Sequence, residues 1–166
     1  DRLQTITERF SKIGSEPKLE NKDIIEETQK SCDYLQSRFS KQVEFSFNAP
    51  KEPIMVLMNP TLHSWTIENL VKNAIDAMKG RGKLALQVIQ DGDLVKINVS
   101  DTGNGIPKSQ FKSVFEPGFT TKKRGWGLGL SLTKRIVEEY HKGTIKVLNS
   151  EIGKGTTMQV IFKKVS

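Results

Sequence analysis

Residues 101–130 read DTGNGIPKSQFKSVFEPGFTTKKRGWGLGL, and this stretch organises the whole chain. A glycine-rich turn opens it at 101–105, and a second glycine-rich turn closes it at 125–129. The segment between the two turns contains two prolines and has no sustained helical or strand period. Irregular segments of this length are uncommon in compact domains and are usually functional, and glycine lets a backbone approach a ligand closely. We therefore predict a lid over phosphate groups, hinged at two glycine turns.

The composition narrows the class of protein. The chain has 166 residues, enough for one domain with a hydrophobic core, and a formal net charge of +7. Its basic residues are not interleaved with aromatic residues, so no nucleic-acid partner is expected. Cys32 is the single cysteine, which fits a reducing compartment such as the cytoplasm. No apolar run approaches the roughly 20 residues of a membrane span, so we expect any membrane anchor only in segments outside this chain.

Hydrophobic periodicity predicts the order helix, two strands, helix, two strands, lid, helix, two strands. The helices are expected at about 21–39, 62–78 and 128–141, and the strands at 43–47, 54–58, 83–89, 94–100, 144–149 and 156–162. Asn21 is the expected cap of the first helix, and 54–58 is expected to be an inner strand because it is continuously apolar. This order predicts an α/β two-layer sandwich, with one mixed, mostly antiparallel sheet and helices on one face.

The first residues carry a narrow helical stripe of the coiled-coil kind, formed by Leu3, Ile6, Phe10 and Ile13. The stripe is already in phase at the first residue, which favours the end of a longer helix over a separate surface helix. We therefore predict a helix remnant and linker at 1–16 and the main domain at 17–166.

The helix expected at 62–78 contains a second constellation, ENLVKNAIDA at 68–77. Its apolar residues form the predicted buried face: Leu70, Val71, Ala74, Ile75 and Met78. Asn69 and Asn73 are four residues apart and share another face, with Asp76 three residues further on. Their amide oxygens are hard, neutral ligands suited to Mg²⁺, and their NH₂ groups can contact phosphate oxygens. A solvated polar face would explain the same pattern.

Asp101 follows an expected inner strand and directly precedes the first glycine turn. A carboxylate fixed there can accept a hydrogen bond from an exocyclic amine such as that of adenine, while Gly103 and Gly105 would let the base pack on backbone. An Asx turn is the alternative reading of this aspartate. The turn at 125–129 leads into a helix whose N-terminal N–H groups can bind an anion, and Lys122 supplies a cation, unless this basic loop is simply solvated. No P-loop and no set of protein-kinase signatures occurs.

Together these segments resemble the catalytic ATP-binding domain of bacterial two-component sensor histidine kinases, within the gyrase, chaperone, histidine kinase and mismatch-repair superfamily. The resemblance implies a Bergerat-type ATP-binding fold. The asparagine, first glycine, phenylalanine and second glycine boxes of this family correspond in order to residues 68–77, 101–105, 111–122 and 125–130. The resemblance extends from about residue 17 to residue 166. The sequence EPGFTTK at 116–122 is most similar to the nitrogen-regulator-like subgroup.

The resemblance implies ATP and Mg²⁺ as cofactors, and it implies roles for individual residues. Asn73 would ligate Mg²⁺, and Asn69 would contact phosphate or metal-bound water, so both belong to the implied metal site. Asp101 would bind the adenine amino group, and Thr156 would support it through a water. Lys122 would reach the phosphates, which makes Asn69, Asn73 and Lys122 the catalytic set. Further nucleotide contacts are implied for Asp76, Gly103, Gly105, Ile106, Gly125, Gly127, Leu128, Gly129 and Leu130.

The resemblance also implies a reaction, which is donation of the ATP γ-phosphoryl group to a histidine on a dimerisation domain. The phosphoryl group would then pass to a response regulator, in a parent protein that is a homodimer. The acceptor is not expected here, because His63 and His141 lie at the ends of predicted helices, and 1–16 would be the end of the second dimerisation helix. Glu68 stands one residue before the general-base position of the ATP-hydrolysing relatives, which favours transfer to a protein. A superfamily ATPase, an anti-sigma-type serine kinase and a non-catalytic nucleotide sensor are the alternatives.

Overall fold

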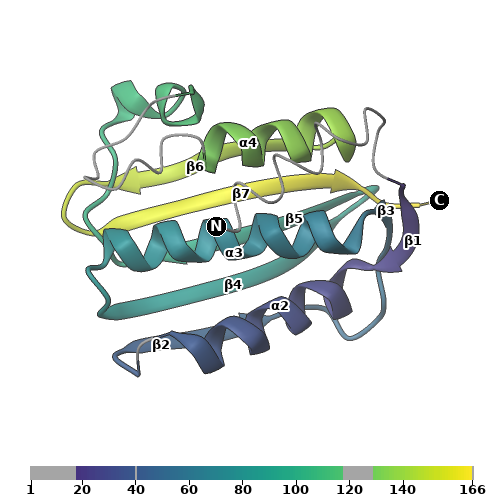
Figure 1. The fold of residues 1–166 in the computed structure, drawn as a ribbon, viewed down its shortest axis with the longest axis horizontal. Helices are drawn as coiled ribbons and strands as arrows, with labels where there is room; N and C mark the ends of the chain where they lie inside the picture. The colour runs from purple at the N-terminus through teal and green to yellow at the C-terminus, as the bar shows by residue number, and fades with distance from the viewer. Residues whose placement is uncertain (1–17, 40, 118–128, 166) are drawn as a thin grey trace.

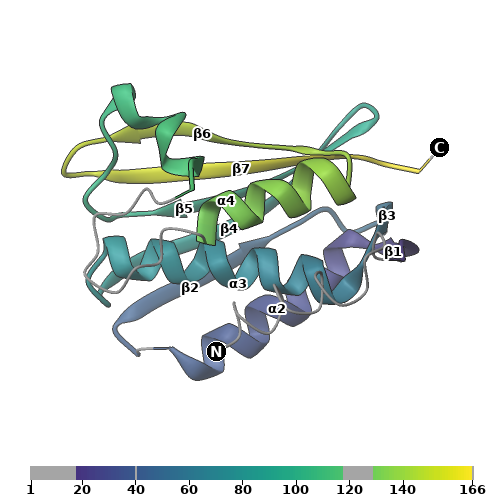
Figure 2. The same ribbon diagram turned by 45° about the horizontal axis from the view of Figure 1, so that its top comes forward.

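The computed structural model describes residues 18–39, 41–117 and 129–165. The main sheet has five strands, and Figures 1 and 2 show the helices side by side on one of its faces, which confirms the predicted two-layer sandwich. The helices are α2 (Ile24–Arg38), α3 (Pro60–Ala77) and α4 (Gly129–Arg135), and α4 continues through a π-helical turn, η4 (Ile136–Tyr140). Two short 3₁₀ turns, η1 (Lys108–Gln110) and η2 (Ser113–Phe115), follow the first glycine turn.

The sheet has the strand order β2-β4-β5-β7-β6. Its strands are β2 (Val43–Asn48), β4 (Gly82–Asp91), β5 (Leu94–Asp101), β6 (Thr144–Glu151) and β7 (Gly155–Lys163). β2 runs parallel to β4, and every other neighbouring pair is antiparallel. β5 is therefore the central strand, and its last residue, Asp101, lies opposite Leu84 on one side and Thr156 on the other.

The core lies between this sheet and the helices. On β5 the alternating residues Val95, Ile97 and Val99 are all buried, as their period predicts. The apolar face of α3 is buried as predicted too, through Leu70, Val71, Ala74, Ile75 and Met78. Complete burial of one aliphatic side chain contributes roughly 1.5–3 kcal/mol, so this layer fixes α3 relative to β5.

The start of α3 is set by local chemistry. The side chain of Asn59 accepts a hydrogen bond from the backbone N–H of Leu62 at 3.0 Å, and Pro60 occupies the first turn, where its missing N–H costs no helical hydrogen bond. With 18 residues α3 is the longest helix of the described chain, and none of the described helices is both long and apolar enough to cross a membrane.

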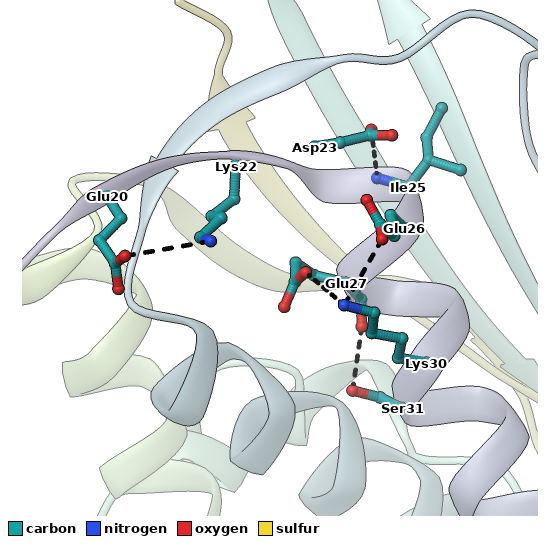
Figure 3. A network of polar contacts seen from close by, with 8 residues as sticks. All are labelled: Glu20, Lys22, Asp23, Ile25, Glu26, Glu27, Lys30 and Ser31. Atoms are coloured by element: carbon teal, nitrogen blue, oxygen red, sulfur yellow. Dashed lines mark hydrogen bonds and ion pairs between the residues drawn. The ribbon is translucent and has the colours of Figure 1, made fainter.

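The prediction that Asn21 caps the first helix is wrong. Asn21 lies in a short strand, β1 (Glu20–Asp23), opposite Leu57 of strand β3 (Met55–Met58). The cap of α2 is Asp23, whose carboxylate accepts from the N–H of Ile25 at 3.0 Å and from that of Ile54 at 3.1 Å. Figure 3 shows Asp23 beside Ile25 at the start of the helix. A carboxylate that satisfies two separate N–H groups is favoured over an asparagine two residues earlier.

The prediction of an inner strand at 54–58 is also wrong. β3 pairs only with β1, in a separate two-stranded sheet. Val56 and Met58 are buried, whereas Met55 and Leu57 are exposed. The continuous apolar run therefore forms a strand with only one buried face, although all of its residues are apolar. The other predicted strands agree with the observed bounds to within two residues.

Candidate functional site

The candidate site begins with Asp101 at the C-terminal end of the central strand. Its carboxylate oxygen Oδ1 accepts a hydrogen bond from the backbone N–H of Gly103 at 2.8 Å, which is an Asx turn. Burial raises the pKa of the Asp101 carboxyl above its ordinary value, and hydrogen bonds from the N–H groups of Gly103 and Thr156 partly oppose that rise. The Asx turn and the acceptor role are therefore compatible, because the turn holds the carboxylate in one orientation.

The first glycine turn is clamped between α3 and the β6–β7 hairpin. A side chain at Gly103 would place its Cβ 2.6 Å from the carbonyl oxygen of Ala77, and one at Gly105 would collide with the carbonyl of Glu151. Asn104 donates its N–H to Ala77 O at 3.1 Å. The missing side chains thus face protein backbone. This close packing explains both glycines, and their contact with a nucleotide stays a prediction.

Thr156 contacts Asp101 directly through its backbone, and the water bridge implied by the resemblance stays a prediction. Its backbone N–H bonds to the Asp101 carboxyl, and its hydroxyl lies 2.8 Å from the hydroxyl of Ser150. Ser150 also accepts from the N–H of Ile106 at 2.7 Å and donates to Gly155 O at 3.1 Å. Ser150 therefore joins the glycine turn to the hairpin. No motif indicated this role, because it depends on where β6 lies in the sheet.

The asparagines of α3 lie on a line of the helix surface that leads to the first glycine turn. Asn69, Asn73 and Ala77 are each four residues apart, so they lie on one line of the helix surface. Asn69 is buried, Asn73 is partly buried, and Asp76 is exposed. Because the first glycine turn packs on Ala77, the line of amides ends close to the turn that follows Asp101.

The buried end of this line is fixed by α4. The Nδ2 group of Asn69 donates to the hydroxyl of Thr133 at 2.7 Å, and Gly129, the first residue of α4, faces the Asn69 amide. Thr133 was not predicted, because nothing in its own neighbourhood marks it. Leu130 packs against the core, and its implied contact with the nucleotide stays a prediction. The other lid residues named above, Lys122, Gly125, Gly127 and Leu128, lie outside the described residues.

The donor set fits a magnesium–nucleotide complex better than a metal ion held by protein alone. Among the described residues no three His, Cys, Asp or Glu side chains lie together as a metal cluster. Asn69 and Asn73 instead offer neutral oxygens from one helix face. Mg²⁺ is usually bound by one or two protein groups together with substrate phosphates and water. The residues present therefore suit an ion that arrives with a phosphate ligand.

The two histidines lie away from this site, in the core. The Nε2 atom of His63 is 2.8 Å from the Thr28 hydroxyl, and the Nε2 atom of His141 accepts from the N–H of Asn59 at 3.0 Å. Both rings make edge contacts with Phe162. Burial lowers the pKa of His63 to about 3, with a smaller effect from nearby His141, and lowers the pKa of His141 to about 4. Both rings are therefore neutral at pH 7.

Comparison with known proteins agrees with this geometry. The family model for histidine kinase-, DNA gyrase B- and HSP90-like ATPases matches residues 61–166. Sensor histidine kinase ZraS of Escherichia coli (strain K12) is 38% identical over 118 residues, which are 71% of this chain and 25% of that protein. Sporulation kinase C of Bacillus subtilis (strain 168) is 39% identical over 94 residues, which are 57% of this chain and 22% of that protein. The chain thus spans about a quarter of the length of these relatives.

Solved structures match over a larger share of the fold. The catalytic domain of histidine kinase ThkA superposes with a TM-score of 0.80 at 28% identity, covering 89% of this chain and 97% of that domain. ThkA solved in complex with the response regulator protein TrrA gives a TM-score of 0.79 at 28% identity, covering 99% of this chain and 48% of that one. The chain therefore belongs to the family of histidine kinase-, DNA gyrase B- and HSP90-like ATPases, as the catalytic ATP-binding domain of a two-component sensor histidine kinase.

Proposed function

We propose that this domain binds ATP together with Mg²⁺ and donates the γ-phosphoryl group to a histidine on the dimerisation domain of its parent protein. The observation that carries the proposal is the carboxylate of Asp101. It stands at the end of the central strand, partly buried, and two backbone N–H groups orient it. A fixed acceptor beside a turn without side chains suits the amino group of adenine, since hydrogen bonds to an ionised partner are the stronger kind.

The phosphate groups are assigned to the asparagine face and the lid. Asn73 ligates the metal ion through its side-chain oxygen, and Asn69 contacts phosphate or metal-bound water. When bound, Mg²⁺ neutralises charge on the phosphate oxygens during in-line transfer. Lys122 supplies a cation to the same oxygens, and residues 125–130 surround them. Support comes from the line that Asn69 and Asn73 form toward the glycine turn on Ala77.

The phosphoryl acceptor is proposed to lie outside this chain. His63 and His141 are buried and engaged with Thr28 and Asn59, so neither ring suits an in-line attack on ATP. The proposed catalytic domain is 17–166, and the parent protein is proposed to be a homodimer in the nitrogen-regulator-like subgroup. The proposal that 1–16 are the end of a dimerisation helix concerns residues outside the described part of the chain. The proposed final partner is a receiver domain, as in ThkA, which was solved with the response regulator TrrA.

The domain is proposed to act in the cytoplasm, where ATP is available, with any membrane attachment of the parent protein through other segments. The single cysteine, Cys32, is buried in the core, and burial raises the pKa of its thiol to about 12. A thiol in that state is unreactive, so Cys32 does not determine whether the compartment is oxidising or reducing. The assignment to the cytoplasm rests on the availability of ATP there.

The test is a calorimetric titration of the chain with Mg-ATP, with ADP release followed over several hours. We expect saturable binding, negligible ADP production, and binding that is roughly 100-fold weaker in Asp101→Asn. Asp91→Asn is the matched control, because Asp91 is exposed in the β4–β5 hairpin and pairs only at the surface with Lys96, at 2.9 Å. Unchanged affinity in the control, with weakened affinity in Asp101→Asn, would assign the effect to the site.

Two outcomes would replace the proposal. Sustained ADP release by the unmodified chain would favour a superfamily ATPase. The absence of binding would leave a module that regulates a partner without using nucleotide. If binding occurs without hydrolysis, transfer of labelled γ-phosphate to the isolated dimerisation domain of the parent protein distinguishes a kinase from a nucleotide sensor.

A further inference from the structure

A single hydroxyl, that of Thr133 on α4, connects the asparagine face of α3 to the helix beside it. Thr133 is completely buried. Its oxygen accepts a hydrogen bond from the Nδ2 group of Asn69 at 2.7 Å, and the hydroxyl donates to the carbonyl of Gly129 at 2.7 Å. Thr133 belongs to none of the sequence boxes described above, so its place beside Asn69 has to be explained separately.

The direction of the two hydrogen bonds follows from the number of protons. A threonine hydroxyl has one proton, and here that proton is directed at the carbonyl of Gly129. The hydroxyl can therefore only accept from Asn69, so the NH₂ group of Asn69 must face it. If the amide rotated by half a turn, either two buried oxygen acceptors would face each other or the hydroxyl would have to give up its hydrogen bond to Gly129, and both arrangements lose a buried hydrogen bond.

Gly129 completes the fit around the amide. A Cβ built on Gly129 would lie 3.0 Å from Asn69 Oδ1 and 3.3 Å from Nδ2. The flat amide thus lies against the backbone of the first residue of α4. With its NH₂ end fixed on Thr133, the Oδ1 atom occupies the other arm of the amide, where it is the only remaining acceptor of the side chain.

We propose that Thr133 is a positioning residue that sets the orientation of the Asn69 amide, so that Oδ1 and not NH₂ is presented to the metal ion or its water shell. This inference rests on the proposed binding of Mg-ATP and adds Thr133 as the residue that orients Asn69. Residues that orient metal ligands commonly change metal affinity by about 10- to 100-fold when they are removed. Thr133 would act only through Asn69 and would touch neither metal nor nucleotide.

Three variants separate this role from simple support of the helix. Thr133→Val keeps the shape but removes the hydroxyl, and Thr133→Ser keeps the hydroxyl. Thr66→Val is the matched control: Thr66 is also buried, and its hydroxyl also donates to the carbonyl four residues earlier, that of Leu62, at 3.0 Å, whereas the hydrogen bond of the Asn69 amide goes to Thr133. A general loss of helix stability should appear equally in both valine variants.

The first measurement needs no nucleotide. The NH₂ resonances of Asn69 are assigned in ¹⁵N spectra by their loss in Asn69→Asp. We expect them to shift, and their exchange with solvent to accelerate, in Thr133→Val but not in Thr133→Ser or Thr66→Val. Unchanged resonances in Thr133→Val would overturn the assigned orientation, whatever the protein does with ATP.

The second measurement is the binding of a non-hydrolysable ATP analogue at increasing Mg²⁺ concentrations. In Thr133→Val we expect the Mg²⁺ concentration for half-maximal binding to rise about tenfold, with unchanged binding in EDTA and with recovery in Thr133→Ser. Equal Mg²⁺ midpoints in Thr133→Val and Thr66→Val would overturn the positioning role alone. If the unmodified chain does not bind the analogue, or binds it without dependence on Mg²⁺, the proposed function fails together with this inference.

Discussion

This domain buries two polar clusters, and they differ in whether their polar atoms find hydrogen-bond partners. Asp101 lies at the end of β5, where the backbone N–H groups of Gly103 and Thr156 bond to its carboxyl. His63 and His141 lie deeper, and each has an Nδ1 atom with no hydrogen-bond partner among the described residues. One cluster supplies donors to a charged acceptor, and the other leaves ring nitrogens unsatisfied.

The difference shows which cluster is built for a ligand. A partly buried carboxylate with oriented donors can keep its charge and accept one more hydrogen bond. Buried imidazoles with lowered pKa values stay neutral, and their edges pack on Phe162. The histidines therefore serve as packing groups, although histidine is also the residue type that is proposed to accept the phosphoryl group.

The largest predicted effect is a loss of folding stability at low pH, which comes from the histidine cluster. Because the pKa values of His63 and His141 are lowered from 6.5 to about 3 and about 4 on folding, the unfolded chain binds more protons below pH 6.5. Stability from this source is fully present above pH 6.5 and is lost as the pH falls. At pH 5 the loss is about 2 kcal/mol for each histidine, or about 4 kcal/mol for the pair. Urea unfolding at pH 7 and pH 5 measures it.

The chain contains two histidines, so a variant with one of them replaced tests the assignment. His141→Leu should be less stable at pH 7, because the N–H of Asn59 loses its acceptor. Its remaining decline between pH 7 and pH 5 should be about half as large. The same decline as in the unmodified chain would mean that other groups cause the acid sensitivity.

The second prediction breaks the Asp101 cluster by steric means. Gly155 has a φ angle of +139°, and a Cβ there would collide with the carbonyl of Asp101. Gly155→Ala should lower the free energy of unfolding by about 3 kcal/mol. Gly153→Ala, where φ is +81° and no heavy atom lies within 4 Å of the added Cβ, should cost about 1 kcal/mol. Equal thermal midpoints for the two variants would show that the hairpin relaxes around the clash.

The third prediction removes the charge of Asp101 without removing its shape. Asp101→Asn should weaken ATP binding roughly 100-fold, or about 2.7 kcal/mol, and should narrow the preference for ATP over GTP, whose guanine carries a carbonyl where adenine has its amino group. The free energy of unfolding should not fall, because burial disfavours the charged form of Asp101. A variant that binds ATP normally would remove Asp101 from the adenine site.

The smallest predicted effect concerns the residue that joins the glycine turn to the hairpin. Ser150→Ala leaves the N–H of Ile106 without its acceptor, which should cost about 1 kcal/mol of stability and should slightly weaken nucleotide binding. Ser37→Ala is a suitable control, since Ser37 also donates to a backbone carbonyl, that of Tyr34, but on the exposed side of α2. Indistinguishable variants would mean that water replaces the Ser150 hydroxyl.

The sequence predicted what is local. The asparagine spacing on α3, the apolar period of β5 and the position of Asp101 are each encoded within one segment, and the structure agrees with all three. The two strands expected at 83–89 and 94–100 likewise form the neighbouring pair β4 and β5.

The missed features depend on residues far apart in the chain. β1 exists because Asn21 pairs with Leu57, and neither residue indicates the other. The roles of Ser150 and Thr133 arise from the places where β6 and α4 lie, and a hydroxyl at such a site looks like any other in the sequence. Hydrophobic patterns locate faces, whereas polar partners depend on the tertiary arrangement.

Asn59 has a consequence beyond capping α3. Its Nδ2 group donates to the carbonyl of Lys18 at 3.1 Å, its Oδ1 atom accepts from Leu62, and its N–H bonds to His141. Asn59 therefore links three segments mechanically: the chain that enters the domain at Lys18, the N-terminal end of α3, and the end of η4. An aspartate would cap the helix equally well but has no proton for Lys18, so this tether requires an amide. The entry of the domain is therefore tied directly to the N-terminal end of the helix that carries Asn69 and Asn73.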